Sequence, residues 1–387
     1  MTTRLIANIG ELTTNDPTLG DATPMGRLRD AALVVDEARV LWVGPSAQAP
    51  ACDEMTDADG AAVVPGFVDS HTHLVFAGER SDEFEARMAG SPYDGGGIAR
   101  TVEATRAATR FELRTQTAKR ARELLAGGVT TMEIKSGYEL TLSGEERLLE
   151  IAGEFTDEVT FLGAHVVPHE FAHDRRAYVA LVIDQMLERC APHARWADVF
   201  CERGAFSVDE ARQILLEARN MGLGLRVHGN QLADSGGVAL ALELDAASVD
   251  HCTHVNDLDL EALGASSTVA TLLPGAEFCT RSAYPSGRRM LDAGVTVALA
   301  TDCNPGTSYV TSMPFVIALA VREMSMTVDE ALWAATRGGA RALRRDDVGH
   351  LGLGARSDVV VLDAPRAAHL AYRPGGGVVR QTLRASR

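Results

Sequence analysis

Eight short apolar runs, separated by helical patterns, constrain the fold of this chain more than any other feature. They cover residues 64–73, 129–137, 159–165, 196–202, 223–230, 247–252, 268–275 and 295–306. Several are continuous apolar stretches without alternation, as expected of parallel strands that are buried on both faces. Helical patterns lie between them, for example over residues 99–128 and 207–222. The order predicts an α/β fold of the (β/α)8 TIM-barrel type.

The helix expected over 207–222 has recognisable ends. Ser207 is its predicted N-cap, with Glu210 three residues later, and Gly222 is its predicted stop. The stretch from Leu74 to Ile98 is long for a strand-to-helix loop and contains the segment SPYDGGGI. In a barrel, such a loop lies on the face where substrate sites form.

Both ends of the chain have β character. The first 60 residues contain short β-like runs separated by Gly, Asp and Pro, and the tail returns to this pattern from Gly349. We therefore expect a small β-rich domain built from residues 1–62 and 346–387, around a barrel of residues 63–345.

Composition excludes several classes of protein. Of the 387 residues, 46% are hydrophobic and 23% charged, which is ordinary for a globular protein and argues against disorder. No run of 18 apolar residues predicts a membrane span, and the N-terminus does not resemble a secretory signal. The net charge of −16 without basic clusters argues against nucleic-acid binding. The six scattered cysteines indicate reduced thiols in a cytoplasm.

Histidines gather where the predicted strands end. His71 and His73 are two residues apart on a strand, so both point to one face. The other strand-end histidines are His165, His228 and His251, and Asp302 ends the eighth strand. The alternative is that some are core histidines bonded to carbonyl groups. Three histidines and one aspartate suit Zn²⁺ or a similar transition metal.

Such a site predicts metal-assisted hydrolysis of a C–N bond. The ion lowers the pKa of a bound water molecule, so that hydroxide forms near neutral pH. Asp302 can take the proton and later deliver it to a leaving nitrogen. His251 can donate a hydrogen bond to the carbonyl oxygen and stabilise the oxyanion that develops there.

The segments VVPGFVDSHTHL, VHGNQ, SVDHC, ALATDCNPGT and LGLGARSDVVVLD resemble the amidohydrolase superfamily. More narrowly, HTHLVFAGERSDEFEARMAG, IKSGYEL, FLGAHVVP, DVFCE, TLLPGAEF and TDCNPGTS resemble the imidazolonepropionases, in the same order from about residue 64 to 360. That resemblance implies hydrolysis of 4-imidazolone-5-propanoate to N-formimidoyl-L-glutamate, the third step of L-histidine degradation. It also implies one Zn²⁺ or Fe³⁺ ion per subunit.

The resemblance assigns a role to each matching position. The metal ligands would be His71, His73, His228 and Asp302. Arg80 would pair with the propionate of the substrate, a role that suits a guanidinium and supplies the local cation that an anionic substrate needs. The other substrate contacts would be Tyr138, His165, Gln231, Asn304, Gly306 and Thr307. The catalytic groups would be Asp302, His251 and Gln231.

Two positions leave the chemistry open. Position 231 is Gln where some members of the family carry Glu, and Gln cannot act as a general base. The base is therefore Asp302 or His251. Lys135 lies at a strand end, and some amidohydrolases carry a carboxylated lysine between two metal ions. That lysine belongs to the fourth strand, whereas Lys135 is on the second, so we favour one metal and a packing or hydrogen-bonding role for Lys135.

Other interpretations remain. Glu202, at the end of the fourth strand, could reach a metal. A thiolate nucleophile from Cys201, Cys252 or Cys303 is conceivable. The chain could be an aminohydrolase acting on a purine or another cyclic amidine, in which case Arg80 would be idle, or a catalytically silent binding protein. We expect a small-molecule substrate and a possible homodimer.

Overall fold

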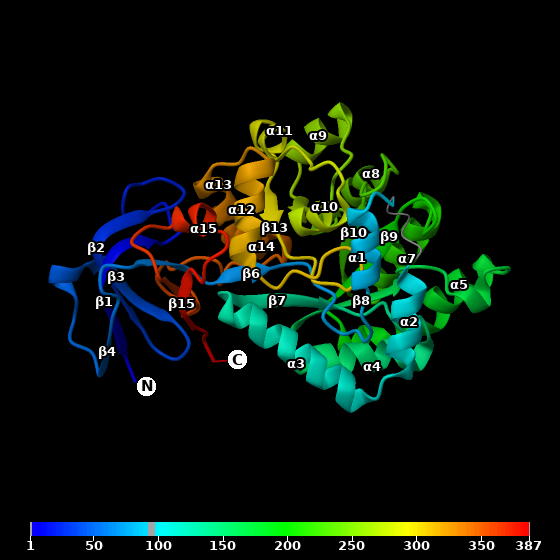
Figure 1. Ribbon diagram of the computed structural model, residues 1–387, viewed down its shortest axis with the longest axis horizontal. Coiled ribbons are helices and arrows are strands. Elements are labelled where there is room, and N and C mark those ends of the chain that lie inside the picture. Colours follow the sequence, from blue (N-terminus) through cyan, green and yellow to red (C-terminus); the bar gives the residue numbers. More distant parts are fainter. Residues whose placement is uncertain (1, 92–96, 387) are drawn as a thin grey trace. The chain divides into compact units, whose positions relative to one another are not determined.

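The main sheet of the chain has eight strands and forms the predicted barrel. The computed structural model describes residues 2–91 and 97–386 (Figure 1). The strands follow the order β13-β12-β11-β10-β9-β8-β7-β6, and the paired neighbours from β7 to β13 run parallel. Their bounds are β6 Phe67–Asp69, β7 Val129–Lys135, β8 Glu158–Ala164, β9 Trp196–Cys201, β10 Gly224–Gly229, β11 Ser248–His251, β12 Val269–Leu272 and β13 Val297–Leu299.

Backbone hydrogen bonds close this sheet between its first and last strands. Thr72, just after β6, forms a parallel bridge with Cys303, just after β13. Asp302 N donates to His71 O at 3.1 Å, and His73 N donates to Cys303 O at 3.0 Å. The segment that carries the two N-terminal histidines therefore lies beside the segment that carries Asp302.

The first expected strand, 64–73, is shorter in the structure. Val64 and Pro65 end strand β5 (Ala62–Pro65), which belongs to a second sheet, and β6 begins after Gly66. Gly66 is needed there, because a Cβ atom at this position would lie 2.2 Å from Thr130 Oγ1. One continuous apolar run therefore serves two sheets.

Helices follow the strands as predicted. Those of the barrel region are α1 Ser81–Met88, α2 Ile98–Ala107, α3 Arg110–Ala126, α4 Leu142–Gly153, α5 Arg175–Leu181, α6 Leu187–Cys190, α7 Val208–Asn220, α8 Gly237–Glu243, α9 Asp257–Gly264, α10 Pro274–Thr280 and α11 Gly287–Asp292. Later helices are α12 Met313–Glu323, α13 Val328–Trp333, α14 Gly339–Ala342 and α15 His369–Tyr372. None of the helices in the described part of the chain is long and apolar enough to cross a bilayer.

Helix α7 has the predicted ends. Ser207 Oγ accepts the Glu210 amide, and the Glu210 side chain accepts the Ser207 amide, which together form a capping box. Its buried face packs against β9 and β10. Gly222, just beyond the helix, has a φ of +86°, a conformation that glycine adopts without strain.

The helix expected over 99–128 is two helices. Ala108 is extended, with φ −75° and ψ 141°, and separates α2 from α3. Thr109 and Glu112 then form a reciprocal pair of contacts of the capping-box type at the start of α3. The long segment from Leu74 contains α1, and residues 92–96 of SPYDGGGI lie outside the described residues.

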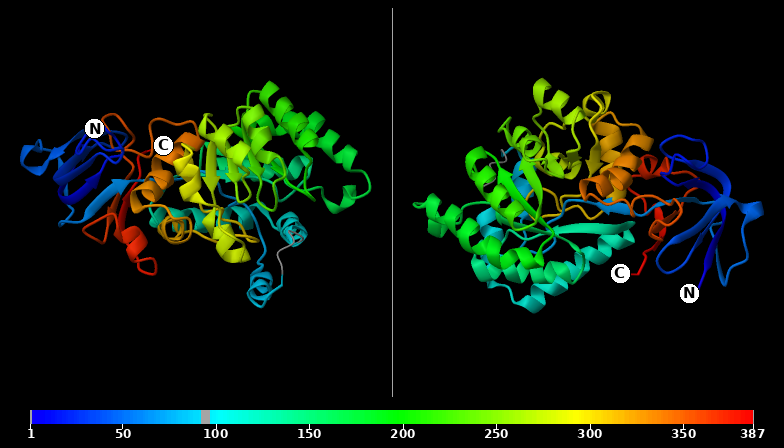
Figure 2. Two further views of the ribbon diagram at one scale, coloured as in Figure 1. Left: turned by 90° about the horizontal axis from the view of Figure 1, so that it is seen from above. Right: turned by 180° about the vertical axis from the view of Figure 1, so that it is seen from behind.

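The two chain ends share a second sheet, as expected. Its order is β15-β14-β5-β1-β2-β3, with β4 also paired to β1. β14 pairs with β5 and β15, both antiparallel, so residues 359–383 join the N-terminal strands. The red C-terminal segment lies next to the blue N-terminal strands in the further views (Figure 2). The bounds are β1 Arg4–Thr13, β2 Arg27–Val35, β3 Val40–Pro45, β4 Glu54–Asp57, β14 Val359–Leu362 and β15 Val379–Leu383.

Backbone proximity divides the chain into two compact units. The first contains Met1–Ser70, Glu123–Thr131 and Ser312–Arg387, and the second contains His71–Arg122 and Met132–Thr311. The second unit carries every candidate site residue. Domain boundaries after residues 62 and 345 stay a prediction.

Candidate active site

Eleven of the twelve candidate residues line one cavity of about 60 Å³. They are His73, Arg80, Tyr138, His165, His228, Gln231, His251, Asp302, Asn304, Gly306 and Thr307. The twelfth, His71, is fully buried beside them. The cavity shares Ile98, Val166, Phe200 and Leu232 with a wider hollow of about 890 Å³. The structure thus brings together residues from positions 71 to 307.

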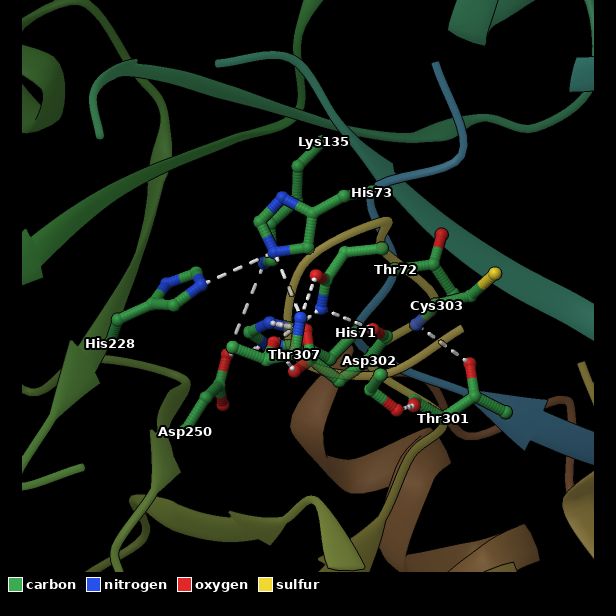
Figure 3. Close-up of polar contacts among 12 residues, drawn as sticks. His71, Thr72, His73, Lys135, His228, Asp250, Thr301, Asp302, Cys303 and Thr307 are labelled. Carbon is green, nitrogen blue, oxygen red and sulfur yellow. Dashed lines mark hydrogen bonds and ion pairs between the residues drawn. The ribbon is translucent and has the colours of Figure 1, made fainter. Parts of the chain in front are cut away.

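Short contacts link one ring nitrogen each of His71, His73 and His228 with a carboxylate oxygen of Asp302 (Figure 3). Asp302 Oδ1 lies 3.5 Å from His71 Nε2 and 3.6 Å from His73 Nε2. His73 Nε2 in turn lies 3.4 Å from His228 Nε2. His71, His73 and Asp302 form one group able to hold a metal ion, and His71, His228 and His251 form another.

These spacings fit a metal ion. Two ligands that each lie about 2.0–2.2 Å from one zinc ion are about 3.4 Å apart in a tetrahedron. His71 Nε2 is also buried without a hydrogen-bond partner among the described residues. Polar atoms that are buried in this way generally have a partner. The donor set, three imidazole nitrogens and one carboxylate oxygen, suits Zn²⁺ and Fe³⁺ alike.

Carboxylates behind the histidines fix the orientation of two rings. His71 Nδ1 lies 2.7 Å from Asp250 Oδ2, and His228 Nδ1 lies 2.9 Å from Asp198 Oδ2. Asp198 Oδ1 also accepts the backbone amide of His228. A carboxylate at Nδ1 leaves Nε2 to face the ligand site, as is usual for metal-binding histidines.

Asp302 is held by the turn that follows it. Thr307 Oγ1 lies 3.2 Å from Asp302 Oδ2. Asn304 Nδ2 donates to the Asp302 carbonyl and to Thr307 Oγ1, while its Oδ1 accepts the amides of Gly306 and Thr307. The Asn304 amide is therefore engaged within the turn. Burial raises the pKa of Asp302 well above its usual range, and a cation beside a carboxylate opposes such a shift.

Arg80 reaches the cavity from the residue before α1. Its Nε and Nη2 donate to the two carboxylate oxygens of Glu83, at 2.9 and 2.6 Å. Nη1 donates to Thr101 Oγ1 at 3.5 Å and also faces Gly306, where an added Cβ atom would lie 2.4 Å from Nη1. The guanidinium thus has one edge fixed by Glu83 and another directed to the cavity.

The remaining rings are buried close to the histidines. His165 Nδ1 lies 2.9 Å from the Gly137 carbonyl, and its ring is stacked at 5.3 Å from that of His73. Burial lowers the pKa of His165 to about 3, so it is neutral. The Tyr138 ring centroid lies 5.2 Å from that of His165.

His251 has a strained backbone. Its φ is +79° and that of Cys252 is +54°, values that residues other than glycine rarely adopt. Burial lowers the pKa of His251 well below its usual value. Strain of this kind concentrates at functional sites.

The thiolate alternative is disfavoured by burial at two of its three cysteines. Burial raises the pKa of the Cys201 thiol to about 11 and that of Cys252 well above its usual range, so neither supplies a thiolate near neutral pH. Glu202 accepts the amides of Gln231 and Leu232 with Oε1, which places its carboxylate behind the Gln231 backbone.

The sequence interpretation missed the carboxylates behind the rings. Asp198 and Asp250 are fully buried in β9 and β11, beside His228 and His71. Their signal is a charged residue inside a continuous apolar run, WADVFC or ASVDHC. Because charged residues are almost never fully buried unless they are paired, such positions indicate a buried polar layer.

Comparison with known proteins identifies the family. The model of the amidohydrolase family matches residues 62–387. An imidazolonepropionase of Mycolicibacterium smegmatis is 62% identical over 384 residues, which covers 99% of this chain and 97% of the relative. One of Streptomyces griseus is 60% identical and covers 100% of this chain and 99% of its own.

The chain belongs to the imidazolonepropionase family.

Solved structures support the fold of this imidazolonepropionase family member. A triazine hydrolase variant aligns with a TM-score of 0.76 at 16% identity, over 100% of this chain and 94% of that one. An adenosine deaminase from Xanthomonas campestris with bound zinc aligns with a TM-score of 0.72 at 20% identity, over 99% of this chain and 91% of that one. At such identities the likeness concerns the barrel fold alone.

Proposed function

We propose that this chain hydrolyses the ring C–N amide bond of 4-imidazolone-5-propanoate to N-formimidoyl-L-glutamate, with His71, His73, His228 and Asp302 as ligands of one metal ion. The observation that carries the proposal is the cluster of these four buried side chains, linked by contacts of 3.4–3.6 Å, in a member of the imidazolonepropionase family. A metal-dependent hydrolase of cyclic amides needs such a group of ligands beside the reacting carbonyl.

The bound ion, Zn²⁺ or Fe³⁺, would polarise the carbonyl and lower the pKa of water. The side chains around the ion transfer the proton and stabilise the developing negative charge. Asp302 accepts the proton of the attacking water and passes it to the ring nitrogen as the C–N bond breaks. The carbonyl carbon becomes a carboxylate, and the nitrogen leaves as part of the formimidoyl group. His251 donates a hydrogen bond to the carbonyl oxygen while negative charge develops on it.

Substrate contacts follow from the lining of the cavity. Arg80 directs Nη1 toward the space beside Gly306, where a propionate can accept from it. Tyr138 and His165 line the same cavity beside His73. Gln231 contacts the imidazolone ring of the substrate by hydrogen bonds and does not act as a base. Thr307 holds the Asp302 carboxylate toward the reacting carbon.

The deciding experiment follows the imidazolone absorbance in the ultraviolet. We expect purified protein to remove the absorbance of freshly generated 4-imidazolone-5-propanoate, a chelator to stop this, and added metal to restore it. Metal-loaded protein without turnover would overturn the assignment. Purines and other cyclic amidines serve as comparison substrates, and turnover of these alone, unaffected by Arg80→Ala, would indicate an aminohydrolase.

The proposal includes the cellular location and the partners of the chain. All six cysteines are free thiols, which supports a reducing cytoplasm. We propose a homodimer and no nucleic-acid partner, the latter from the net charge of −16. Sedimentation at several protein concentrations tests the dimer.

A further inference from the structure

A layer of buried charges lies directly behind the candidate metal ligands. It contains Lys135 and Glu133 on β7, Asp198 on β9, Arg226 on β10 and Asp250 on β11, and all are at most 1% exposed. Three carboxylates and two cations leave the layer with a formal charge of −1. Buried charges are costly unless they are paired, so the arrangement of this layer is fixed by its contacts.

Lys135 is the centre of these contacts. Its Nζ lies 2.9 Å from Glu133 Oε1, 2.9 Å from Asp198 Oδ2 and 3.9 Å from Asp250 Oδ2. The carboxylates on either side hold the pKa of Lys135 above its usual value, despite complete burial. A carboxylated lysine would add a negative charge to a layer that is already negative. Lys135 is therefore an ammonium and not a bridging metal ligand.

Each of the three carboxylates contacts a different part of the chain that carries the proposed metal ligands. Asp198 Oδ2, which touches Lys135, is the same atom that lies 2.9 Å from His228 Nδ1. Asp250 Oδ2 is likewise the atom that lies 2.7 Å from His71 Nδ1, and Arg226 holds it from another side at 3.2 Å.

Glu133, the third carboxylate, contacts the backbone between His71 and His73. Its Oε2 accepts the amide of Thr72, the residue between His71 and His73, at 3.0 Å. The Lys135 amide also donates to the Thr72 carbonyl at 3.0 Å. The segment that carries His71 and His73 is thus tied to β7 at the point where Lys135 lies.

We propose that Lys135 is a positioning residue of the metal centre: its ammonium fixes the carboxylates that orient His71, His228 and the Thr72 backbone. The inference rests on the proposed metal site but goes beyond it, because Lys135 is neither one of the four proposed ligands nor a residue that lines the cavity. Without the ammonium, Asp198 would lose its cation, and the His228 ring would lose its fixed orientation.

The test exploits the presence of only two lysines in the chain, Lys119 and Lys135. Lys135→Met removes the ammonium at similar volume, and Lys119→Met, at an exposed position of α3, is the matched control. Cobalt(II) affinity is measured by competition with a chelator, together with the visible spectrum of the cobalt-loaded protein. We expect Lys135→Met to bind cobalt about 10–100-fold more weakly with an altered spectrum, and Lys119→Met to match the wild type.

A double variant separates positioning from charge balance. Lys135→Met with Glu133→Gln keeps the layer at −1, so the urea midpoint should recover while cobalt affinity stays low, because Asp198 still lacks its ammonium. Wild-type affinity and spectrum in folded Lys135→Met would overturn the inference, as would full recovery of affinity in the double variant. Failure of both Lys135→Met and the double variant to fold would assign Lys135 to the fold alone. Wild-type protein that binds no cobalt would instead contradict the metal site itself.

Discussion

Arg80 and Gly306 lie in direct contact: a Cβ atom on residue 306 would come within 2.4 Å of Arg80 Nη1 and 2.9 Å of its Cζ. The guanidinium has little freedom to retreat, because Glu83 holds its other edge with two hydrogen bonds. The space in which a substrate carboxylate can meet Arg80 thus depends on the absence of a side chain at position 306.

Gly306→Ala should therefore weaken substrate binding more than the chemical step. The added methyl group displaces the guanidinium, and we expect KM to rise about tenfold, equivalent to ~1.4 kcal/mol, with kcat much less affected. Steady-state kinetics on 4-imidazolone-5-propanoate measure this. The control is Gly153→Ala, at the end of α4, where a Cβ atom meets nothing within 4 Å. A fall in kcat at constant KM would contradict the role of Arg80 in binding.

The general base is tested by comparing Asp302 with Gln231. Asp302→Asn removes a proton acceptor and should lower kcat by about 10²–10⁴-fold. Gln231→Ala removes only hydrogen bonds and should cost about tenfold or less. Metal content of each variant is determined alongside the kinetics, because Asp302 is also a proposed ligand. If metal-loaded Asp302→Asn and Gln231→Ala lost equal amounts of kcat, the result would contradict the assignment of the general base to Asp302.

The strands and the clustering of the strand-end histidines were predictable because both depend on a local pattern. Parallel strands buried on two faces appear as continuous apolar runs, and the ends of these runs carry the histidines that meet in the cavity. Ser207 and Glu210 marked the start of α7 in the same way, since a capping box involves residues only three positions apart.

The features that the sequence did not predict depend mainly on contacts between residues that are distant in the chain. Lys135 meets Asp198 across 63 positions, and no local pattern indicates which acid a buried lysine will pair with. The division of residues 64–73 between two sheets reflects pairing of Val64 with Val360. By contrast, the break between α2 and α3 had a local signal, Thr109 with Glu112, which the continuous helical pattern concealed.

Glu277 should make stability depend on pH above the acid range. Burial raises the pKa of its carboxyl to about 7 from the usual 4.5, with one hydrogen bond from Thr253 opposing the shift. The folded chain holds this proton more tightly than the unfolded chain. Its contribution to stability is therefore complete below about pH 4.5 and is lost as the pH rises toward about 7.

Glu277→Gln removes the buried charge. In metal-free protein we expect the variant to exceed the wild type in free energy of unfolding by about 1–3 kcal/mol at pH 8, with little difference at pH 4.5. Urea denaturation at the two pH values measures this, and Glu123→Gln, at an exposed position of α3, is the control. A variant less stable than the wild type at pH 8 would mean that Glu277 is charged and stabilising in the folded protein.

Glu210 should show the opposite dependence. Hydrogen bonds from Arg175 lower the pKa of this carboxyl to about 2, against partial burial, and the Ser207 amide and hydroxyl add to the effect. The unfolded chain therefore takes up the proton first as the pH falls. The stabilisation is complete above about pH 5 and is lost between about pH 4.5 and 2.

Glu210→Gln removes this stabilisation together with half of the capping box of α7. The wild type should exceed the variant in free energy of unfolding at pH 6, and the difference should shrink when urea denaturation is repeated at pH 3. The size of the effect is limited, because the pair is partly exposed and water screens it. Glu188→Gln, at an exposed position of α6, should show neither the deficit nor its pH dependence. A deficit that is equal at both pH values would indicate that Glu210 acts through the geometry of the cap, since an amide cannot reproduce both contacts, and not through its charge.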